Sequence, residues 1–195
     1  QLCDALQEVA GSDFQWIRDV TISNGTWGNR LFRVPAPDQA AHAAGGGIGQ
    51  CLSMAIGAAV GSPERLTLAL VGDGGLALNA AELPTAVQEN TGLVLIVMND
   101  KGYGILRNLS DAQFGGRRFY SDLHTPHFGK LAEAYGHVGI KIEKPSEVEP
   151  ALKEMIRLKD RTVFLDVRTD PTENVWPMVE AGKGITEMLL GSEEL

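Results

Sequence analysis

The stretch Thr67–Arg107, TLALVGDGGLALNAAELPTAVQENTGLVLIVMNDKGYGILR, decides the fold of this chain. Its uninterrupted apolar run at 68–71 predicts a strand that is covered on both faces. The glycine-rich sequence at 72–75 predicts a tight turn at the carboxyl end of that strand. A helix is expected from about 79 to 90, and residues 93–98 predict a second buried strand. Two consecutive strands joined by a helix are normally parallel, with a right-handed crossover.

An acidic residue follows each of these two strands. Asp73 lies in the glycine-rich turn, and Asp100 lies in the polar sequence Asn99–Gly102. The carboxyl ends of parallel strands meet at one edge of the sheet, where open α/β sheets hold their ligands. The two carboxylates are therefore expected close together, beside a helix N-terminus. In the alternative interpretation, Asp73 only caps the following helix and Asp100 lies in a surface turn.

Three kinds of ligand come into question at such a site. A dinucleotide fits the relaxed fingerprint formed by Gly72, Gly74 and Ala77. A nucleoside triphosphate is excluded, because the Lys-Ser/Thr pair of the phosphate-binding P-loop is missing. A diphosphate held through a divalent cation fits better, since the carboxylate of Asp73 would repel a bare pyrophosphate. Two converging aspartates together with phosphate oxygens suit Mg²⁺.

A second glycine-rich stretch precedes the first strand of this region. Residues Gly45–Gly49 carry four glycines in five positions, which lets the backbone approach a ligand with no side chain between them. A helix of small residues is expected to follow. His42, just upstream, is interpreted as a hydrogen-bonded structural residue rather than a catalytic one. A flexible loop without a ligand is the alternative.

The rest of the chain continues the alternation of strands and helices, which predicts a doubly wound, Rossmann-like parallel sheet of about six strands with helices on both faces. The expected helices are residues 1–10, 126–136 and 146–158, the last with Ser146 as its N-cap. The expected strands are residues 14–22, 138–142 and 162–167.

Composition narrows the function. The chain has 195 residues, enough for one α/β domain, and a net charge of −8 with no basic stripe, which argues against nucleic acid as a partner. No signal peptide or membrane-spanning apolar run is present, and the two cysteines form no disulfide framework, so a cytoplasmic setting is expected. The first residue is Gln1 rather than Met, which suggests a processed chain or an excised piece.

The glycine turn and the polar pair at the next strand end together resemble the cofactor motif of thiamine diphosphate (TPP) enzymes. In that family the Asp of the Gly-Asp-Gly triplet, the second residue of the final pair and a carbonyl two residues later bind Mg²⁺. The resemblance assigns these roles to Asp73, Asp100 and the carbonyl of Gly102. Asn is more usual where Asp100 stands, which leaves the metal preference open. Tyr103-Gly104 after the pair also agrees with the family.

The resemblance extends to the rest of the cofactor site. The carbonyl of Gly46 would accept from the aminopyrimidine group, and Ile48 would hold the cofactor bent. The loop with Ser23 and Asn24 would contact the diphosphate, and Ile105 and Leu106 would form the apolar floor of the substrate pocket. The implied cofactor-binding residues are Ser23, Asn24, Gly46, Gly47, Ile48, Gly72, Gly74, Gly75, Tyr103, Gly104 and Ile105.

The resemblance is closest to acetolactate synthases and benzoylformate decarboxylases. It implies that residues 1–195 form the diphosphate- and Mg²⁺-binding domain of an enzyme in which the cofactor attacks a 2-oxo acid, CO₂ leaves, and the carbanion is protonated or passed to a second carbonyl. The activating Glu of that family comes from a pyrimidine-binding domain of a neighbouring subunit, and no such domain is found in this chain. A homodimer or homotetramer, and negligible turnover by the chain alone, are therefore expected.

The sequence leaves open the function of the protein, the role of Arg107 and the roles of two later segments. A benzoylformate decarboxylase- or aldehyde lyase-type activity, a nicotinamide-dependent oxidoreductase domain and a non-catalytic regulatory domain are the alternatives. Arg107 is expected either to neutralise a substrate carboxylate or to form a surface ion pair. Residues 111–125 are expected to form a mobile lid, and the tail at 171–190 to fold over the site or to dock on a partner.

Overall fold

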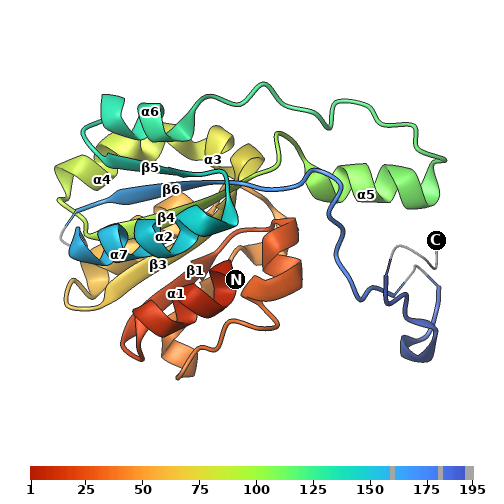
Figure 1. Ribbon diagram of the computed structural model, residues 1–195, viewed down its shortest axis with the longest axis horizontal. Coiled ribbons are helices and arrows are strands. Elements are labelled where there is room, and N and C mark those ends of the chain that lie inside the picture. The colour runs from red at the N-terminus through yellow and green to blue at the C-terminus, as the bar shows by residue number, and fades with distance from the viewer. Residues whose placement is uncertain (159–160, 180–181, 192–195) are drawn as a thin grey trace.

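The computed structural model describes residues 1–158, 161–179 and 182–191, which form a parallel sheet between two layers of helices (Figure 1). The strand order is β2-β1-β3-β4-β6-β5. The strands are β1 (Phe14–Arg18), β2 (Ala40–His42), β3 (Leu66–Gly72), β4 (Leu93–Asn99), β5 (Val138–Ile142) and β6 (Val163–Arg168). The α-helices are α1 (Leu2–Ala10), α2 (Cys51–Gly61), α3 (Asp73–Asn79), α4 (Leu83–Gln88), α5 (Gly104–Gln113), α6 (Phe128–Ala134) and α7 (Val148–Arg157).

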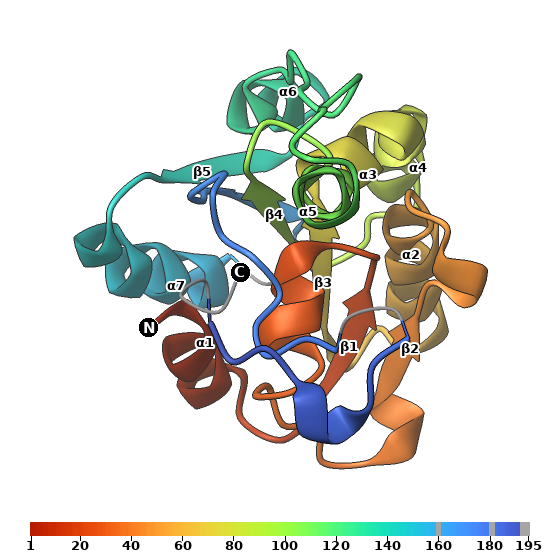
Figure 2. The ribbon, with the colours of Figure 1, turned by 90° about the vertical axis from the view of Figure 1, so that its right-hand side faces the viewer.

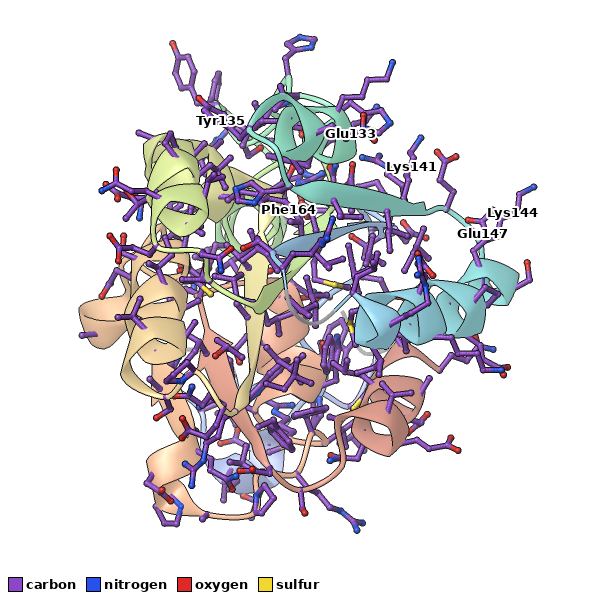
Figure 3. All side chains as sticks on the ribbon, turned by 90° about the vertical axis from the view of Figure 1, so that its left-hand side faces the viewer. Glu133, Tyr135, Lys141, Lys144, Glu147 and Phe164 are labelled. Atoms are coloured by element: carbon purple, nitrogen blue, oxygen red, sulfur yellow. The ribbon has the colours of Figure 1, made fainter. Side chains whose placement is uncertain are left out.

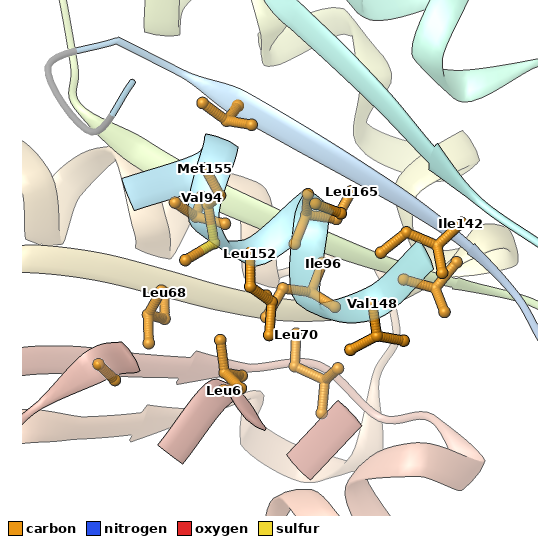
Figure 4. Close-up of a cluster of buried hydrophobic side chains, with 14 of the residues drawn as sticks. Leu6, Leu68, Leu70, Val94, Ile96, Ile142, Val148, Leu152, Met155 and Leu165 are labelled. Atoms are coloured by element: carbon orange, nitrogen blue, oxygen red, sulfur yellow. The ribbon is translucent and has the colours of Figure 1, made fainter. Parts of the chain in front are cut away.

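Side chains of the central strands alternate between two hydrophobic clusters, one on each face of the sheet. Leu68 and Leu70 of β3 pack in the cluster with α1 and α7, which Figure 4 shows in close-up. Ala69 and Val71 pack on the opposite face with α2, α3, α4 and α6. Fully burying a leucine or valine side chain stabilises the fold by roughly 1.5–3 kcal/mol. The doubly wound α/β fold predicted from the sequence is therefore confirmed.

The first strand is shorter than expected. β1 ends at Arg18 rather than near residue 22, because the carboxylate of Asp19 accepts a hydrogen bond from the amide of Val20 (2.8 Å) and the chain leaves the sheet there. The strand that the sequence did not locate is β2, which pairs with β1 in the register Trp16↔Ala40. Three residues at a sheet edge are too few to show a periodicity.

The helix after β3 begins earlier than predicted. Asp73 is already the first residue of α3, so the glycines that follow it form a helical turn rather than a separate tight turn. Gly74 is required for packing, because a Cβ there would lie 2.5 Å from the ring of Tyr103. The helix expected at about 79–90 is instead divided between a 3₁₀ turn at Ala80–Glu82 and α4, whose first turn contains Pro84.

Two other boundaries differ from the prediction. Ser146 does not cap α7, because residues Pro145–Glu147 form a 3₁₀ turn. The carboxylate of Glu147 there accepts from the amides of Glu143 (2.7 Å) and Lys144 (3.1 Å), and α7 begins only at Val148. Figure 3 shows Lys144 and Glu147 beyond the end of β5, towards the start of α7.

The segment that was expected to form a mobile lid, residues 111–125, contains part of a helix and a bridge residue. Residues 111–113 belong to α5, which projects from the carboxyl edge of the sheet in Figure 1. Farther on, Gly102 and Asp122 form an isolated antiparallel bridge. Whether residues 111–125 move as a lid stays a prediction. Among the described residues, no helix has the length and apolar character needed to cross a membrane.

Candidate cofactor site

A cavity of about 220 Å³ opens at the carboxyl edge of the sheet, between the segments that follow β1, β3 and β4. After β1 the chain crosses to the face of the sheet that carries α1 and α7, where Trp27 packs. After β3 it crosses to the opposite face, so a crevice forms between the two strand ends. Ligands of doubly wound sheets bind in such a crevice. Its lining residues are Val20, Thr21, Ile22, Gly46, Ile48, Gly72, Asp73, Gly74, Gly75, Asp100, Gly102, Tyr103, Gly104, Ile105 and Leu106.

The structure brings together every predicted site residue except Ser23, Asn24 and Gly47. Ser23 lines a neighbouring cavity of about 240 Å³ together with Asp100. Asn24 is buried, and its Nδ2 atom lies 3.4 Å from Nε2 of His42. Gly47 is exposed, and its carbonyl accepts from the side chain of Gln50 (2.8 Å). The expected contacts of Asn24 and Gly47 with the cofactor therefore gain no support from the geometry.

The sequence did not point to Val20, Thr21 and Ile22, which line the cavity. They were expected in the first strand, but β1 ends before them, so they lie in the turn at the sheet edge. The polar pair Arg18-Asp19 was the available signal for this strand end, since Asp is uncommon within strands.

Asp19 holds the glycine loop against this edge of the sheet. Its Oδ2 atom accepts from the amides of Gly49 (2.9 Å) and Cys51 (3.2 Å), and its side chain is fully buried. Gly46 has a φ of 71°, a left-handed conformation that favours glycine. The loop thereby presents Gly46 and Ile48 to the cavity.

The two acids at the strand ends are close enough for Asp100 to raise the pKa of Asp73. Asp73 is 1% exposed, and its Oδ2 atom accepts from the amide of Gly102 (3.1 Å). Burial, and secondly the charge of Asp100, raise the pKa of Asp73 to about 7. Burial also raises the pKa of Asp100, against the opposing effect of the Arg107 guanidinium.

The donor set of this pair fits a divalent cation. The Oδ1 atom of Asp73 is buried and has no hydrogen-bond partner among the described residues. A buried carboxylate oxygen without a partner is costly, and a cation removes both that cost and the repulsion from Asp100. The described residues contain no group of three or more His, Cys, Asp or Glu side chains placed for a metal. Main-chain and ligand oxygens would therefore complete the coordination, as is usual for Mg²⁺.

Gly102 occupies the tightest position of the site. A Cβ atom there would overlap the carbonyl oxygen of Ser121 and lie 2.6 Å from Nη2 of Arg107. The preceding Lys101 has a φ of 60°, which is uncommon for a residue with a side chain. These constraints fix the backbone whose carbonyl was assigned to the metal.

We expect Gly102→Ala to destabilise the fold by about 1–3 kcal/mol, because a new methyl group must displace main chain. Gly57→Ala is the matched control: Gly57 lies within α2, and a Cβ there meets nothing within 4 Å. The control should gain about 0.5–1 kcal/mol from higher helix propensity. Urea unfolding of both variants measures these changes. Equal stability of the two variants would show that the strand-end turn can relax.

The start of α5 closes the cavity on its other side, and Figure 2 views this helix end-on at the ends of the strands. Ile105 and Leu106 line the cavity, and Leu106 is 50% exposed. The ion pair expected for Arg107 is present, but it is buried rather than on the surface. Arg107 does not line the cavity, so its expected contact with a substrate carboxylate gains no support from the geometry. Its guanidinium Nη2 atom donates to Oδ2 of Asp100 (2.8 Å) instead.

The described tail lies beside α5. Asn174 accepts a hydrogen bond from the side chain of Asn108 (2.7 Å), and residues of α5 and the tail line a cavity of about 270 Å³. The tail is held to the body of the domain by Arg30, whose side chain donates to the carbonyls of Trp176 and Pro177. That the tail folds over the site or docks on a partner stays a prediction.

The fold and the cavity together define a doubly wound α/β domain that is suited to a cofactor with a cation-bound diphosphate. The family model described as the thiamine pyrophosphate enzyme C-terminal TPP-binding domain matches residues 22–167. The chain belongs to this family of TPP-binding domains.

Individual relatives agree with the family model. The chain is 37% identical over 141 residues to the acetolactate synthase large subunit of Haemophilus influenzae, a match that covers 72% of this chain and 25% of that protein. It is 37% identical over 152 residues to the isozyme 3 large subunit of Escherichia coli, covering 76% and 26%. The chain thus spans about a quarter of the length of these relatives.

Solved structures show the same fold. Benzoylformate decarboxylase from Polynucleobacter necessarius superposes with a TM-score of 0.80 at 25% identity, covering 89% of this chain and 33% of that one. A thiamine diphosphate-dependent 4-hydroxybenzoylformate decarboxylase of Rhodococcus jostii gives 0.78 at 27% identity, covering 87% and 32%. The chain is therefore a TPP-binding domain homologous to acetolactate synthase and benzoylformate decarboxylase-type enzymes.

Proposed function

We propose that this domain holds thiamine diphosphate through a Mg²⁺ ion, as part of a 2-oxo acid decarboxylase or carboligase of the acetolactate synthase-like group. The observation that carries the proposal is the buried Oδ1 atom of Asp73, which has no hydrogen-bond partner in the described part of the chain and lies near a second acid at the neighbouring strand end. Asp73, Asp100 and the carbonyl of Gly102 are the proposed protein ligands of the ion.

The other residues of the cavity orient and enclose the cofactor in this proposal. Gly46 offers its carbonyl, and the half-buried side chain of Ile48 supports the bend of the molecule. Ile105 and Leu106 keep water from the reacting carbon on the side of α5. When bound, thiamine diphosphate supplies the nucleophilic carbon and the electron sink for decarboxylation.

The proposal includes a second domain. A Glu from the pyrimidine-binding domain of a neighbouring subunit would activate the cofactor, in a homodimer or homotetramer, in the cytoplasm. The half-exposed side chain of Leu106 at the cavity leaves an apolar surface on which such a domain could pack. We therefore expect negligible turnover of a 2-oxo acid by this chain alone.

The relatives suggest two outcomes for the same site. Acetolactate synthases would pass the two-carbon unit to a second carbonyl, whereas benzoylformate decarboxylase-type enzymes would release an aldehyde. The apolar side chains of Ile105 and Leu106 at the cavity are compatible with the 2-oxo acid substrate of either kind of enzyme. The second domain would largely determine whether the carbon unit is protonated or passed to a second carbonyl compound.

A titration of the chain separates the proposed cofactor from the alternatives. Thiamine diphosphate and NAD are each added with and without Mg²⁺, and binding is followed by calorimetry. We expect binding of thiamine diphosphate only when Mg²⁺ is present, because the diphosphate otherwise faces two aspartates. Binding of NAD without metal would favour an oxidoreductase domain. Binding of neither cofactor would favour a regulatory domain that has kept only the fold.

A further inference from the structure

Arg107 is a buried cation directly behind the proposed metal site. Its side chain is 5% exposed, and its Nη2 atom donates both to Oδ2 of Asp100 (2.8 Å) and to the main-chain carbonyl of the same residue (3.1 Å). The nearest other acid is Asp122, whose carboxylate is 80% exposed and lies 3.7 Å from Nη1. The strong partner of the guanidinium is therefore Asp100.

Several features of the chain make room for this ion pair. Gly102 has no side chain, and a Cβ there would lie 2.6 Å from Nη2. A Cβ at Gly104 would overlap Oδ2 of Asp100. Arg107 itself is fixed in the first turn of α5, where its amide donates to the carbonyl of Tyr103 (3.1 Å). A guanidinium held at this point has little freedom to leave the carboxylate.

The ion pair changes what Asp100 can offer to a cation. The guanidinium donates to Oδ2, so we assign Oδ1 as the oxygen of Asp100 that would meet a metal. The pair is neutral as a unit, so Asp73 supplies the remaining negative charge. Mg²⁺ demands six ligands in near-ideal octahedral geometry, whereas Ca²⁺ accepts more oxygens and often takes both oxygens of one carboxylate.

We propose that Arg107 is a positioning residue that makes Asp100 a neutral, one-oxygen ligand and thereby sets the preference of the site for Mg²⁺ over Ca²⁺. This inference rests on the proposed function, because it concerns the same metal. Arg107 does not touch the cavity, so its effect passes through Asp100.

The test compares the wild-type chain with Arg107→Met, Asp100→Asn and the double variant. Affinities for Mg²⁺ and for Ca²⁺ are measured by calorimetry in the presence of thiamine diphosphate, and stability is measured in EDTA. Arg107→Met frees the second oxygen of Asp100, so the ratio of the two affinities should shift at least tenfold towards Ca²⁺. The double variant, with one amide oxygen and no charge, should return the ratio to within about threefold of wild type.

The stability measurement gives a readout that does not depend on metal. Asp100→Asn alone leaves the buried guanidinium without its carboxylate and should lower the denaturation midpoint, whereas the double variant should recover it. A ratio unchanged within twofold in Arg107→Met, with wild-type binding intact, would overturn this inference alone. Absence of Mg²⁺-dependent binding in the wild-type chain would overturn the proposed function and the inference together.

Discussion

Asp73→Ala is expected to abolish Mg²⁺-dependent binding of thiamine diphosphate, with a loss of at least 100-fold in affinity. Asp73 is more deeply buried than Asp100, the other proposed side-chain ligand. Its Oδ1 atom has no hydrogen-bond partner among the described residues. Once its charge is gone, the only acid left among the proposed ligands is Asp100, whose charge is balanced by Arg107, so the protein no longer offers a net negative charge to the ion. A 100-fold loss corresponds to about 2.7 kcal/mol. Calorimetric titration with both Mg²⁺ and cofactor measures the effect.

Two further variants show whether the loss is specific. Asp73→Asn keeps the shape of the side chain but removes its charge, so it should lose metal-dependent binding and yet fold at least as stably as wild type. Asp13→Ala removes an acid before β1, at the opposite edge of the sheet, where Asp13 makes a surface ion pair with Arg65. It should bind like wild type. Unchanged binding by Asp73→Asn would show that the charge of Asp73 is not needed to hold the ion.

The parts of the site that could be predicted are those that follow from chain connectivity. Two buried apolar runs joined by a helix must be parallel, so Asp73 and Asp100 had to emerge at one edge, and the structure places both in one cavity. The glycines at 46, 74 and 102 were visible for a similar reason. Gly74 and Gly102 stand where a ring or a backbone approaches closely, and Gly46 has a left-handed backbone conformation that favours glycine.

The parts that could not be predicted depend on contacts between distant segments. Asp19 follows β1 and holds the glycine loop by accepting hydrogen bonds from main-chain amides about thirty residues later. Every residue except proline has such an amide, so the sequence does not reveal which ones Asp19 binds. The burial of Arg107 depends on how α5 leaves the sheet, so its seven-residue separation from Asp100 suggested no ion pair. Asn24 points to His42 because the chain after β1 forms a π-helical turn rather than a plain loop.

The second large effect concerns the pH dependence of stability. Because Asp73 has a pKa of about 7 in the folded chain and 3.8 as its ordinary value, the folded state binds this proton more tightly than the unfolded state. A metal-free chain therefore carries this stabilising contribution in full below about pH 4 and loses it as the pH rises to about 7. The expected loss is about 2 kcal/mol, less than the full shift implies, because part of it is shared with Asp100.

Asp73→Asn removes the titration of Asp73 and leaves every other titrating residue in place, so the difference between the two chains reports Asp73 together with its coupling to Asp100. The free energy of unfolding, measured in EDTA from pH 4 to pH 8, should fall more steeply for wild type than for Asp73→Asn. Adding Mg²⁺ and thiamine diphosphate at pH 8 should restore stability to wild type only, because the ion then occupies the place of the proton. Parallel pH profiles in EDTA would mean that Asp73 is ionised and satisfied without metal. The geometry of its unpartnered oxygen would then no longer argue for a cation.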